Sequence, residues 1–371
     1  MKLKILTALL VAGIASAEHS MLAPLGFNKI VCLTNSDTIV GVPFRMQGSM
    51  RNQLASAPIA DPGDPDLFEI PLQSLNLTPG ALDRHYLKFE GGAREGRWYD
   101  ITANSATSVT IDLNGDTLDG VTQGDPVILT EYWTLDTLFP PDQATTSWTE
   151  HPANPGEWIQ NGHAIVASAG TRAFERRTEV LLPNIDGEGI NRSSTGFYFI
   201  HQAQWKKVNE QGTEFGSTIL PPDSIFTIRN PSSVSHGTVF RISGSVDLSN
   251  FTIPLHTSTN SQRDAFIGLP RPVDVTLKEL NLWESGAFIQ SIGTRAFQRR
   301  DELLVYDNAQ SSLPKSVVAF YFHDGTNWLA VNDDDKLNRD DDVIPAGSGF
   351  IIRKYQTGTG ETVFWNNQPS Y

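Results

Sequence analysis

The sequence predicts an all-β fold made of two similar modules, with a smaller β domain inserted into the first of them. One observation is a repeat: Gly170–Arg177 (Gly-Thr-Arg-Ala-Phe-Glu-Arg-Arg) returns 123 residues later as Gly293–Arg300 with one substitution. Another is that short runs of apolar and β-branched residues are separated by Gly, Pro and Asn turns. A third is that no stretch of a dozen residues keeps the 3.6-residue period of an amphipathic helix.

The repeat extends beyond this motif and defines the module boundaries. Its matched positions, first copy then second, are Phe197-Tyr198-Phe199 with Phe320-Tyr321-Phe322, Trp205 with Trp328, Ile228-Arg229 with Ile352-Arg353 and Val239-Phe240 with Val363-Phe364. A leading strand also recurs, because Asp37–Pro43 resembles Asp264–Pro270 at an offset of 227 residues. We therefore assign residues 18–57 and 128–249 to the first module, 58–127 to the inserted domain and 250–371 to the second module.

Each module is expected to be a β-sandwich or a partly closed barrel. Short strands such as Glu179–Leu182 and Ile225–Arg229 follow one another at the spacing of an all-β domain. Trp205 and Trp328 occupy matched positions, which favours a place in two hydrophobic cores. In the inserted domain, apolar and polar residues alternate along Ser108–Leu113, as in a half-buried strand, so we expect a small barrel or meander there.

The first residues of the chain have the features of an export signal. Met1–Ala17 combines two lysines, an apolar run and a small-residue cleavage site. The apolar run is too short for a transmembrane helix, which needs about 20 residues, and no later segment is long enough. We expect a signal peptide over residues 1–17 and an exported protein that is extracellular, periplasmic or attached to the cell surface.

The net charge limits the classes of partner that the protein can bind, and the single cysteine bears on the core. The chain has a net charge of −14, with 42 acidic and 28 basic residues. This charge weighs against binding to a nucleic acid backbone or to anionic lipid, both of which need clustered lysine and arginine. Cys32 is the single cysteine and lies in an apolar run, so we expect it to be buried.

The densest positive feature is the arginine set of the repeated motif. Its members are Arg172, Arg176 and Arg177 in the first copy and Arg295, Arg299 and Arg300 in the second. Arginine can bind sulfate, uronate or carboxylate groups through two parallel hydrogen bonds, so the set is a candidate clamp for such a group. The alternative is structural: the arginines pair with nearby acids such as Glu179 or Asp301 and hold a turn in shape.

Two runs of aspartate frame a short loop in the second module and form a candidate calcium site. They are Asp333, Asp334, Asp335, Asp340, Asp341 and Asp342. Six carboxylates within ten residues repel one another unless a cation or solvent screens them, and Ca²⁺ takes six to eight oxygen ligands. The matching loop of the first copy, residues 210–217, has only two acids. A solvated acidic loop is therefore the favoured interpretation, with calcium as the alternative and no other cofactor expected.

Tryptophans outside the matched positions are candidate sugar platforms, because an aromatic ring on a β surface can stack against a sugar. Trp98 and Trp133 are the two that we single out, with burial in a core or interface as the alternative. No catalytic signature is present: the Gly-x-Ser-x-Gly, His-Glu-x-x-His and Walker patterns are all missing. The acids are too numerous for a glycosidase pair to be recognised. Enzymatic activity stays open, with a non-catalytic role favoured.

Several sequence segments resemble those of a verrucomicrobial family of exported paralogous proteins. They are Asp37–Pro43, Gly124–Val127 followed by Trp133–Phe139, the stretch Pro345–Lys354 and the segment Trp365–Tyr371. The resemblance covers nearly all of the chain after the signal and implies export and a β-rich fold. The family is uncharacterised, so no ligand or site residue follows from it.

Together these features predict an exported, non-catalytic surface or envelope protein that acts in assembly or adhesion through its repeated modules. Its partner would be a protein, a polysaccharide or another copy of the chain. One alternative is a polysaccharide-binding protein that uses surface aromatics. Another is a glycoside hydrolase, which no motif supports.

Overall fold

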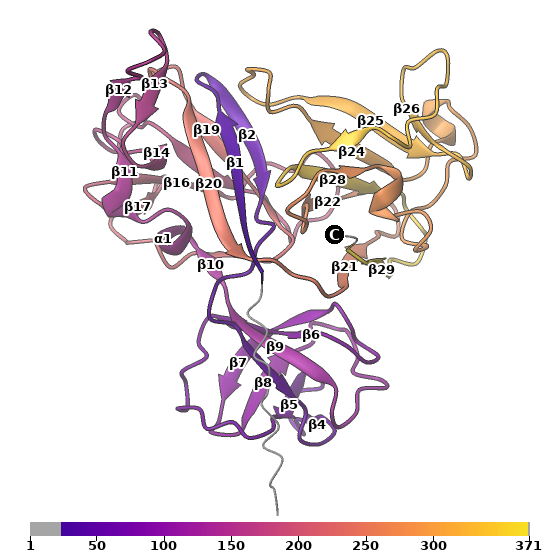
Figure 1. Cartoon of the computed structure of the whole chain (residues 1–371). Coiled ribbons are helices and arrows are strands. Elements are labelled where there is room, and N and C mark those ends of the chain that lie inside the picture. The colour runs from indigo at the N-terminus through magenta and orange to yellow at the C-terminus, as the bar shows by residue number, and fades with distance from the viewer. Residues whose placement is uncertain (1–23, 370–371) are drawn as a thin grey trace, which may run out of the picture.

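The computed structural model describes residues 24–369 and confirms that the fold is all-β. The predicted signal peptide lies outside the described residues. Figure 1 shows three lobes: the first and second modules stand side by side, and the inserted domain lies below them. Within residues 24–369, no helix has the length and apolar character needed to cross a membrane.

The first module contains a five-stranded sheet with the order β17-β16-β15-β19-β2. Its strands are β1 (Leu25–Cys32), β2 (Ser36–Gly41), β10 (Trp133–Thr134), β11 (Ala144–Thr145), β12 (Trp148–Glu150), β13 (Trp158–Gln160), β14 (His163–Val166), β15 (Glu179–Leu182), β16 (Gly196–His201), β17 (Gln204–Lys207), β18 (Ile219–Leu220), β19 (Ile225–Asn230) and β20 (Thr238–Ser245). Four-residue helix α1 (Leu135–Leu138) and 3₁₀ turn η1 (Pro141–Gln143) follow β10. The remaining strands form two-stranded sheets, such as β1 with β20.

The second module has the same strand order in its own five-stranded sheet, β26-β25-β24-β28-β22. Its elements are β21 (Phe251–His256), β22 (Arg263–Gly268), β23 (Val275–Thr276), η2 (Lys278–Leu280), η3 (Ala296–Gln298), β24 (Glu302–Tyr306), β25 (Val317–His323), β26 (Trp328–Ala330), β27 (Val343–Ile344), β28 (Gly349–Lys354) and β29 (Thr362–Asn367). Strand β21 pairs with β29 as β1 pairs with β20. The segments that match in sequence thus occupy equivalent strands.

The inserted domain is one seven-stranded antiparallel sheet with the order β3-β9-β6-β7-β8-β5-β4. Its strands are β3 (Met50–Gln53), β4 (Ile59–Ala60), β5 (Leu67–Pro71), β6 (His85–Phe89), β7 (Trp98–Asn104), β8 (Ser108–Asp112) and β9 (Pro126–Glu131). A bridge from Leu54 to Leu72 brings the two ends of the sheet together. The sheet begins before and ends after the expected range 58–127, because β3 and β9 pair within it.

Each lobe has its own hydrophobic core, which explains why the chain divides this way. Trp205 and Trp328 are 0% and 1% exposed at the centres of the two module cores, as their matched positions predicted. Cys32 is also buried, as expected, and burial raises the pKa of its thiol to about 11. This thiol is therefore an unreactive core group.

The two modules meet where the recurring leading strands β2 and β22 end. A Cβ atom on Gly41 would lie 2.5 Å from Cα of Gly268, and one on Gly268 would lie 2.4 Å from the carbonyl oxygen of Ser224. The Gly41 amide donates to the carbonyl of Gly347 across the interface (2.9 Å), and the Gly268 amide donates to that of Asp223 (2.8 Å). Only glycine permits backbones to approach this closely.

Ion pairs of two buried aspartates flank the glycines symmetrically. Asp37 receives two hydrogen bonds from Arg229, at 2.7 and 2.8 Å, and Asp264 receives two from Arg353, at 2.8 and 3.1 Å. Loops from the opposite module cover both aspartates. The amide of Asp37 donates to the carbonyl of Ser312, and the amide of Asp264 donates to that of Gly189. Each module therefore satisfies backbone groups at the edge of its neighbour.

We predict that Gly268→Ala lowers the free energy of unfolding by about 1–3 kcal/mol, because the new methyl group would press against the backbone of the first module. Gly212→Ala is the matched control, since nothing lies within 4 Å of its added methyl group. Urea unfolding should show the loss for the first variant and a change within about 0.5 kcal/mol for the second. Equal effects of the two changes would contradict a glycine-dependent interface.

Candidate functional site

In the first module, the repeated motif forms a tight loop between β14 and β15, held by its second arginine. Nε of Arg176 donates to Oε1 of Glu179 at 2.6 Å, and Nη1 donates to the carbonyl of Thr171 at 3.2 Å. The amide of Arg177 donates to the Ser168 hydroxyl at 3.0 Å. These bonds fix the loop from both sides.

The second module builds the same loop with the same bonds. Nε of Arg299 donates to Oε1 of Glu302 at 2.6 Å, and its Nη1 donates to the carbonyl of Thr294 at 3.1 Å. The amide of Arg300 donates to the Ser291 hydroxyl at 3.1 Å. Arg176 and Arg299 thus hold the loop in shape, as the structural alternative predicted. The expected pairing of a motif arginine with Asp301 is wrong, because Asp301 pairs with Lys354.

The two loops also expose the same three residues, which we call the Arg-Ala-Phe tips (Arg172–Phe174 and Arg295–Phe297). Phe174 is 76% exposed and Phe297 is 74% exposed, and both arginines beside them are exposed. Burying a phenylalanine is worth about 1.5–3 kcal/mol, and neither module gains this energy. Sequence reasoning named the arginines and missed the phenylalanines, although both copies carry one.

The predicted calcium loop holds its acids apart. Asp333 receives a hydrogen bond from Arg339 at 2.7 Å, Asp340 accepts the amide of Trp328 at 2.9 Å, and Asp342 accepts the Tyr321 hydroxyl at 2.8 Å. In the described part of the chain, no group of three or more His, Cys, Asp or Glu side chains is placed to hold a metal ion. Calcium binding by this loop stays a prediction.

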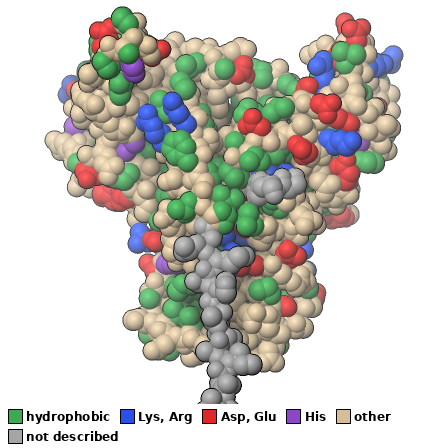
Figure 2. Space-filling view, viewed as in Figure 1, with side chains coloured by type: hydrophobic (Ala, Val, Ile, Leu, Met, Phe, Trp, Pro, Cys, Tyr) green, Lys and Arg blue, Asp and Glu red, His purple; other side chains and the backbone are tan. Residues whose placement is uncertain are grey.

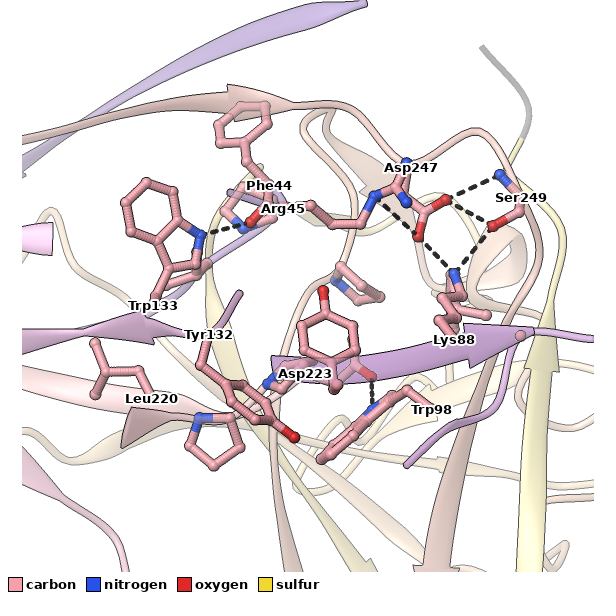
Figure 3. Close-up of a pocket in the computed structure, with 18 of the residues that line it drawn as sticks. Phe44, Arg45, Lys88, Trp98, Tyr132, Trp133, Leu220, Asp223, Asp247 and Ser249 are labelled. Atoms are coloured by element: carbon pink, nitrogen blue, oxygen red, sulfur yellow. Dashed lines mark hydrogen bonds and ion pairs between the residues drawn. The ribbon is translucent and has the colours of Figure 1, made fainter. Parts of the chain in front are cut away.

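Trp98 and Trp133 lie at the junction of the three lobes and are only partly exposed. Figure 3 shows their indole N–H groups bonded inside this junction. Nε1 of Trp98 donates to Oδ2 of Asp223 at 3.2 Å, and Nε1 of Trp133 donates to the carbonyl of Phe44 at 2.9 Å. The junction surrounds a cavity of about 60 Å³.

A charged network lines the other side of this cavity (Figure 3). Lys88 of the inserted domain donates to Asp247 and, at 3.1 Å, to Ser249, both in the segment that leads to the second module. Nε of Arg45 lies 3.8 Å from Oδ2 of Asp247, and its Nη1 lies 3.6 Å from Oε1 of Glu90. The side chains of Arg45 and Lys88 are each only 6% exposed, so water screens these charges little.

The junction is better suited to joining the lobes than to binding a substrate. Ligand pockets typically measure about 300–1,000 Å³, so this cavity of about 60 Å³ is too small for such a ligand and has room for only a few water molecules. Asp223 connects all three lobes. It belongs to the first module, its carboxylate accepts a hydrogen bond from the indole of Trp98 in the inserted domain, and its backbone carbonyl accepts one from the amide of Gly268 in the second module. The charged groups here act as cross-links.

Comparison of the chain with protein-family models, with curated proteins and with solved structures finds no match. The candidate sites therefore rest on geometry and chemistry alone.

Within the repeated motif, we predict that the two arginines behave differently. Arg176→Ala should lower the free energy of unfolding by about 1–2 kcal/mol, because it removes a partly buried ion pair and a bond to a carbonyl. Arg172→Ala should change it by less than about 0.5 kcal/mol, because that side chain is exposed. Thermal unfolding monitored by circular dichroism distinguishes the two, and the pair Arg299→Ala and Arg295→Ala should repeat the contrast. A loss at the exposed positions as large as at the paired ones would show that the tips are structural.

Asp223 should make stability depend on pH. Burial raises the pKa of its carboxyl from 3.8 to about 6, with Lys88 opposing the shift and Asp247 adding to it. Between these values the folded chain keeps a proton that the unfolded chain releases, so this residue lowers stability as pH rises from about 4 to 6.

The variant Asp223→Asn cannot ionise and keeps an oxygen that can accept the Trp98 bond. Its gain over the original protein should grow across this window to about 1–2 kcal/mol, after allowance for partial exposure, and then stay level up to pH 8. Urea unfolding at pH 4, 5, 6 and 7.5 measures the gain. A difference that does not change with pH would mean that Asp223 is already ionised at pH 4.

Proposed function

We propose that the protein is an exported, non-catalytic surface or envelope protein that acts in assembly through its repeated β modules. The observation that carries this proposal is the pair of Arg-Ala-Phe tips. An exposed phenylalanine beside an exposed arginine, on a loop fixed by several hydrogen bonds, is suited to contact with an acidic surface that offers an apolar pocket. Its occurrence in both modules favours selection for contact over chance exposure.

A second copy of this chain offers the complementary charge. The chain carries a net charge of −14, while each tip adds an arginine that no acid neutralises by a salt bridge within the described residues. Two tips fixed on one body can engage together, and such paired contacts raise overall affinity by about 10²–10⁴-fold where the geometry permits.

Strand β1 supplies a further apolar surface that supports assembly. Among the described residues it pairs on one edge only, with β20, and it directs Leu25, Phe27 and Val31 outward at 69%, 62% and 51% exposure. Figure 2 shows apolar side chains gathered on this face between the two modules. Lys29 is the one charged residue on this face, and an edge strand with a mostly apolar face is prone to pair with another chain. Polysaccharide binding through Trp98 and Trp133 has less support, because both side chains are engaged in the junction.

We predict concentration-dependent self-association that the tips control. Sedimentation velocity at low salt should show oligomers of the original protein, a weaker tendency for Phe174→Ala or Phe297→Ala, and a loss of at least about tenfold in association constant for the double variant. Removing one buried aromatic contact costs about 1.5–3 kcal/mol, which corresponds to this factor or more. Added salt should weaken association, since the tips carry charge.

Ile59→Ala is the control, because Ile59 is 52% exposed in the inserted domain, away from both tips. It should leave association unchanged. If the double tip variant associates like the original while Phe27→Lys abolishes association, then β1 and not the tips makes the contact. A protein that stays monomeric up to about 100 µM would refute self-assembly and direct attention to adhesion to another partner.

A further inference from the structure

A groove of about 350 Å³ opens where the facing sheets of the two modules meet, apart from the tips and from the junction cavity. Its floor comes from β2, β15 and β19 of the first module, and Phe266 and Tyr306 of the second module close it. This volume falls within the range of about 300–1,000 Å³ that is typical of ligand sites. No sequence motif marked the groove, because its residues come from distant parts of the chain.

The groove is positive although the protein is acidic. Arg229 lines it but is neutralised by Asp37. Two further cations line it: Arg192 of the first module and Lys315 of the second, and within residues 24–369 neither forms a salt bridge. Lys315 donates to the Ser36 hydroxyl and the Asp307 carbonyl, both at 3.2 Å, and also to the Gln310 carbonyl, and all three acceptors are neutral.

Arg192 is the stronger indication of an anionic ligand. Its guanidinium lies 5.1 Å above the Phe266 ring and donates one hydrogen bond to the carbonyl of Asp264, while Nε and Nη1 are buried with no hydrogen-bond partner in the described part of the chain. Burial lowers the pKa of both Arg192 and Lys315, since it removes water from the charged forms. An anion in the groove would compensate both groups.

The remaining walls have the character of a sugar site. Phe197 and Phe266 provide aromatic surface, Ser194 and Thr227 provide hydroxyl groups, and the Tyr306 hydroxyl makes no hydrogen bond to another described residue. Aromatic rings pack against the C–H faces of a pyranose, and hydroxyls exchange hydrogen bonds with its own. A fatty acid would leave these hydroxyls unsatisfied, so the mixture of groups favours a polar ligand.

We propose that this groove binds an acidic saccharide, with the uronate carboxylate between Arg192 and Lys315 and the sugar rings against Phe197 and Phe266. This site is independent of the assembly proposed above, since it shares no residue with the tips. An acidic peptide has the same charge but lacks the hydroxyl-rich rings, so it serves as the competing outcome.

The test is isothermal titration calorimetry of the whole protein with a galacturonate tetrasaccharide at low salt. The methyl-esterified tetrasaccharide is the matched ligand, because it keeps the rings and removes the charge. The acidic tetrasaccharide should bind at least about tenfold more tightly than the ester. Raising NaCl from 50 to 300 mM should weaken binding of the acidic tetrasaccharide and leave binding of the ester unchanged. A glutamate hexapeptide should bind more weakly than the acid.

Arg192→Gln should weaken binding of the acid by about tenfold or more and leave the ester nearly unchanged. Arg51→Gln is the matched control, since it removes an arginine from the exposed edge of the inserted domain and should have no effect. Because Arg192 also bonds across the module interface, Tyr306→Phe provides a second variant that removes one oxygen and should weaken both ligands about threefold.

Three results would overturn the proposal. One is no binding of the acid at millimolar concentration. Another is equal affinity for acid and ester, or tighter binding of the peptide. The third is unchanged affinity in both Arg192→Gln and Tyr306→Phe. Self-association measured on the same samples reports on the tips separately, so failure of one proposal does not imply failure of the other.

Discussion

The close approach of β2 and β22 at Gly41 and Gly268 is the contact on which the rest of the structure depends. It brings two sheets of the same strand order face to face and aligns Asp37 and Asp264 under loops from the opposite module. The groove exists because these sheets face one another. The junction exists because the loop that carries Asp223 reaches Gly268 on one side and Trp98 on the other. A single backbone contact therefore positions three different parts of the molecule.

The two modules show which features of the repeat are constrained. The motif loops keep the bonds that close each loop, such as Arg176–Glu179 and its equivalent in the second module. The third arginine of the motif differs, since Arg177 donates to the carbonyl of Ser233 whereas Arg300 lies over the Tyr355 ring. One buried pair also differs: Thr178 donates to Asn230 in the first module, and the equivalent positions in the second hold Asp301 and Lys354, both fully buried. A buried ion pair gives little net stability over a neutral pair of similar size, so this position is free to change. The exposed tips, which add no stability, are unchanged.

Much of the fold could be predicted from the sequence, because the repeat defines equivalent strands and matched tryptophans indicate the cores. The candidate functional sites were harder to predict from the sequence. Local spacing correctly suggested the Arg176–Glu179 pair but not the Asp301–Lys354 pair, whose members are 53 residues apart. Trp98 and Trp133 were singled out as aromatics, yet their bonding partners come from other lobes. The groove combines residues 192, 229 and 315, and only the packing of two modules brings them together.

Rigidity links the junction to the tips. Two weak contacts reinforce each other only when the body between them holds their separation, since a flexible connection lowers the effective concentration of the second contact. Here the separation is set by the glycine contact and by loops that each module places over a buried aspartate of the other. Opening the interface would leave the amides of Asp37 and Asp264 without the carbonyls of Ser312 and Gly189, and unpaired buried donors are costly, so partial opening is disfavoured. The same interface that forms the groove thereby holds the two tips at a fixed distance, as paired docking requires.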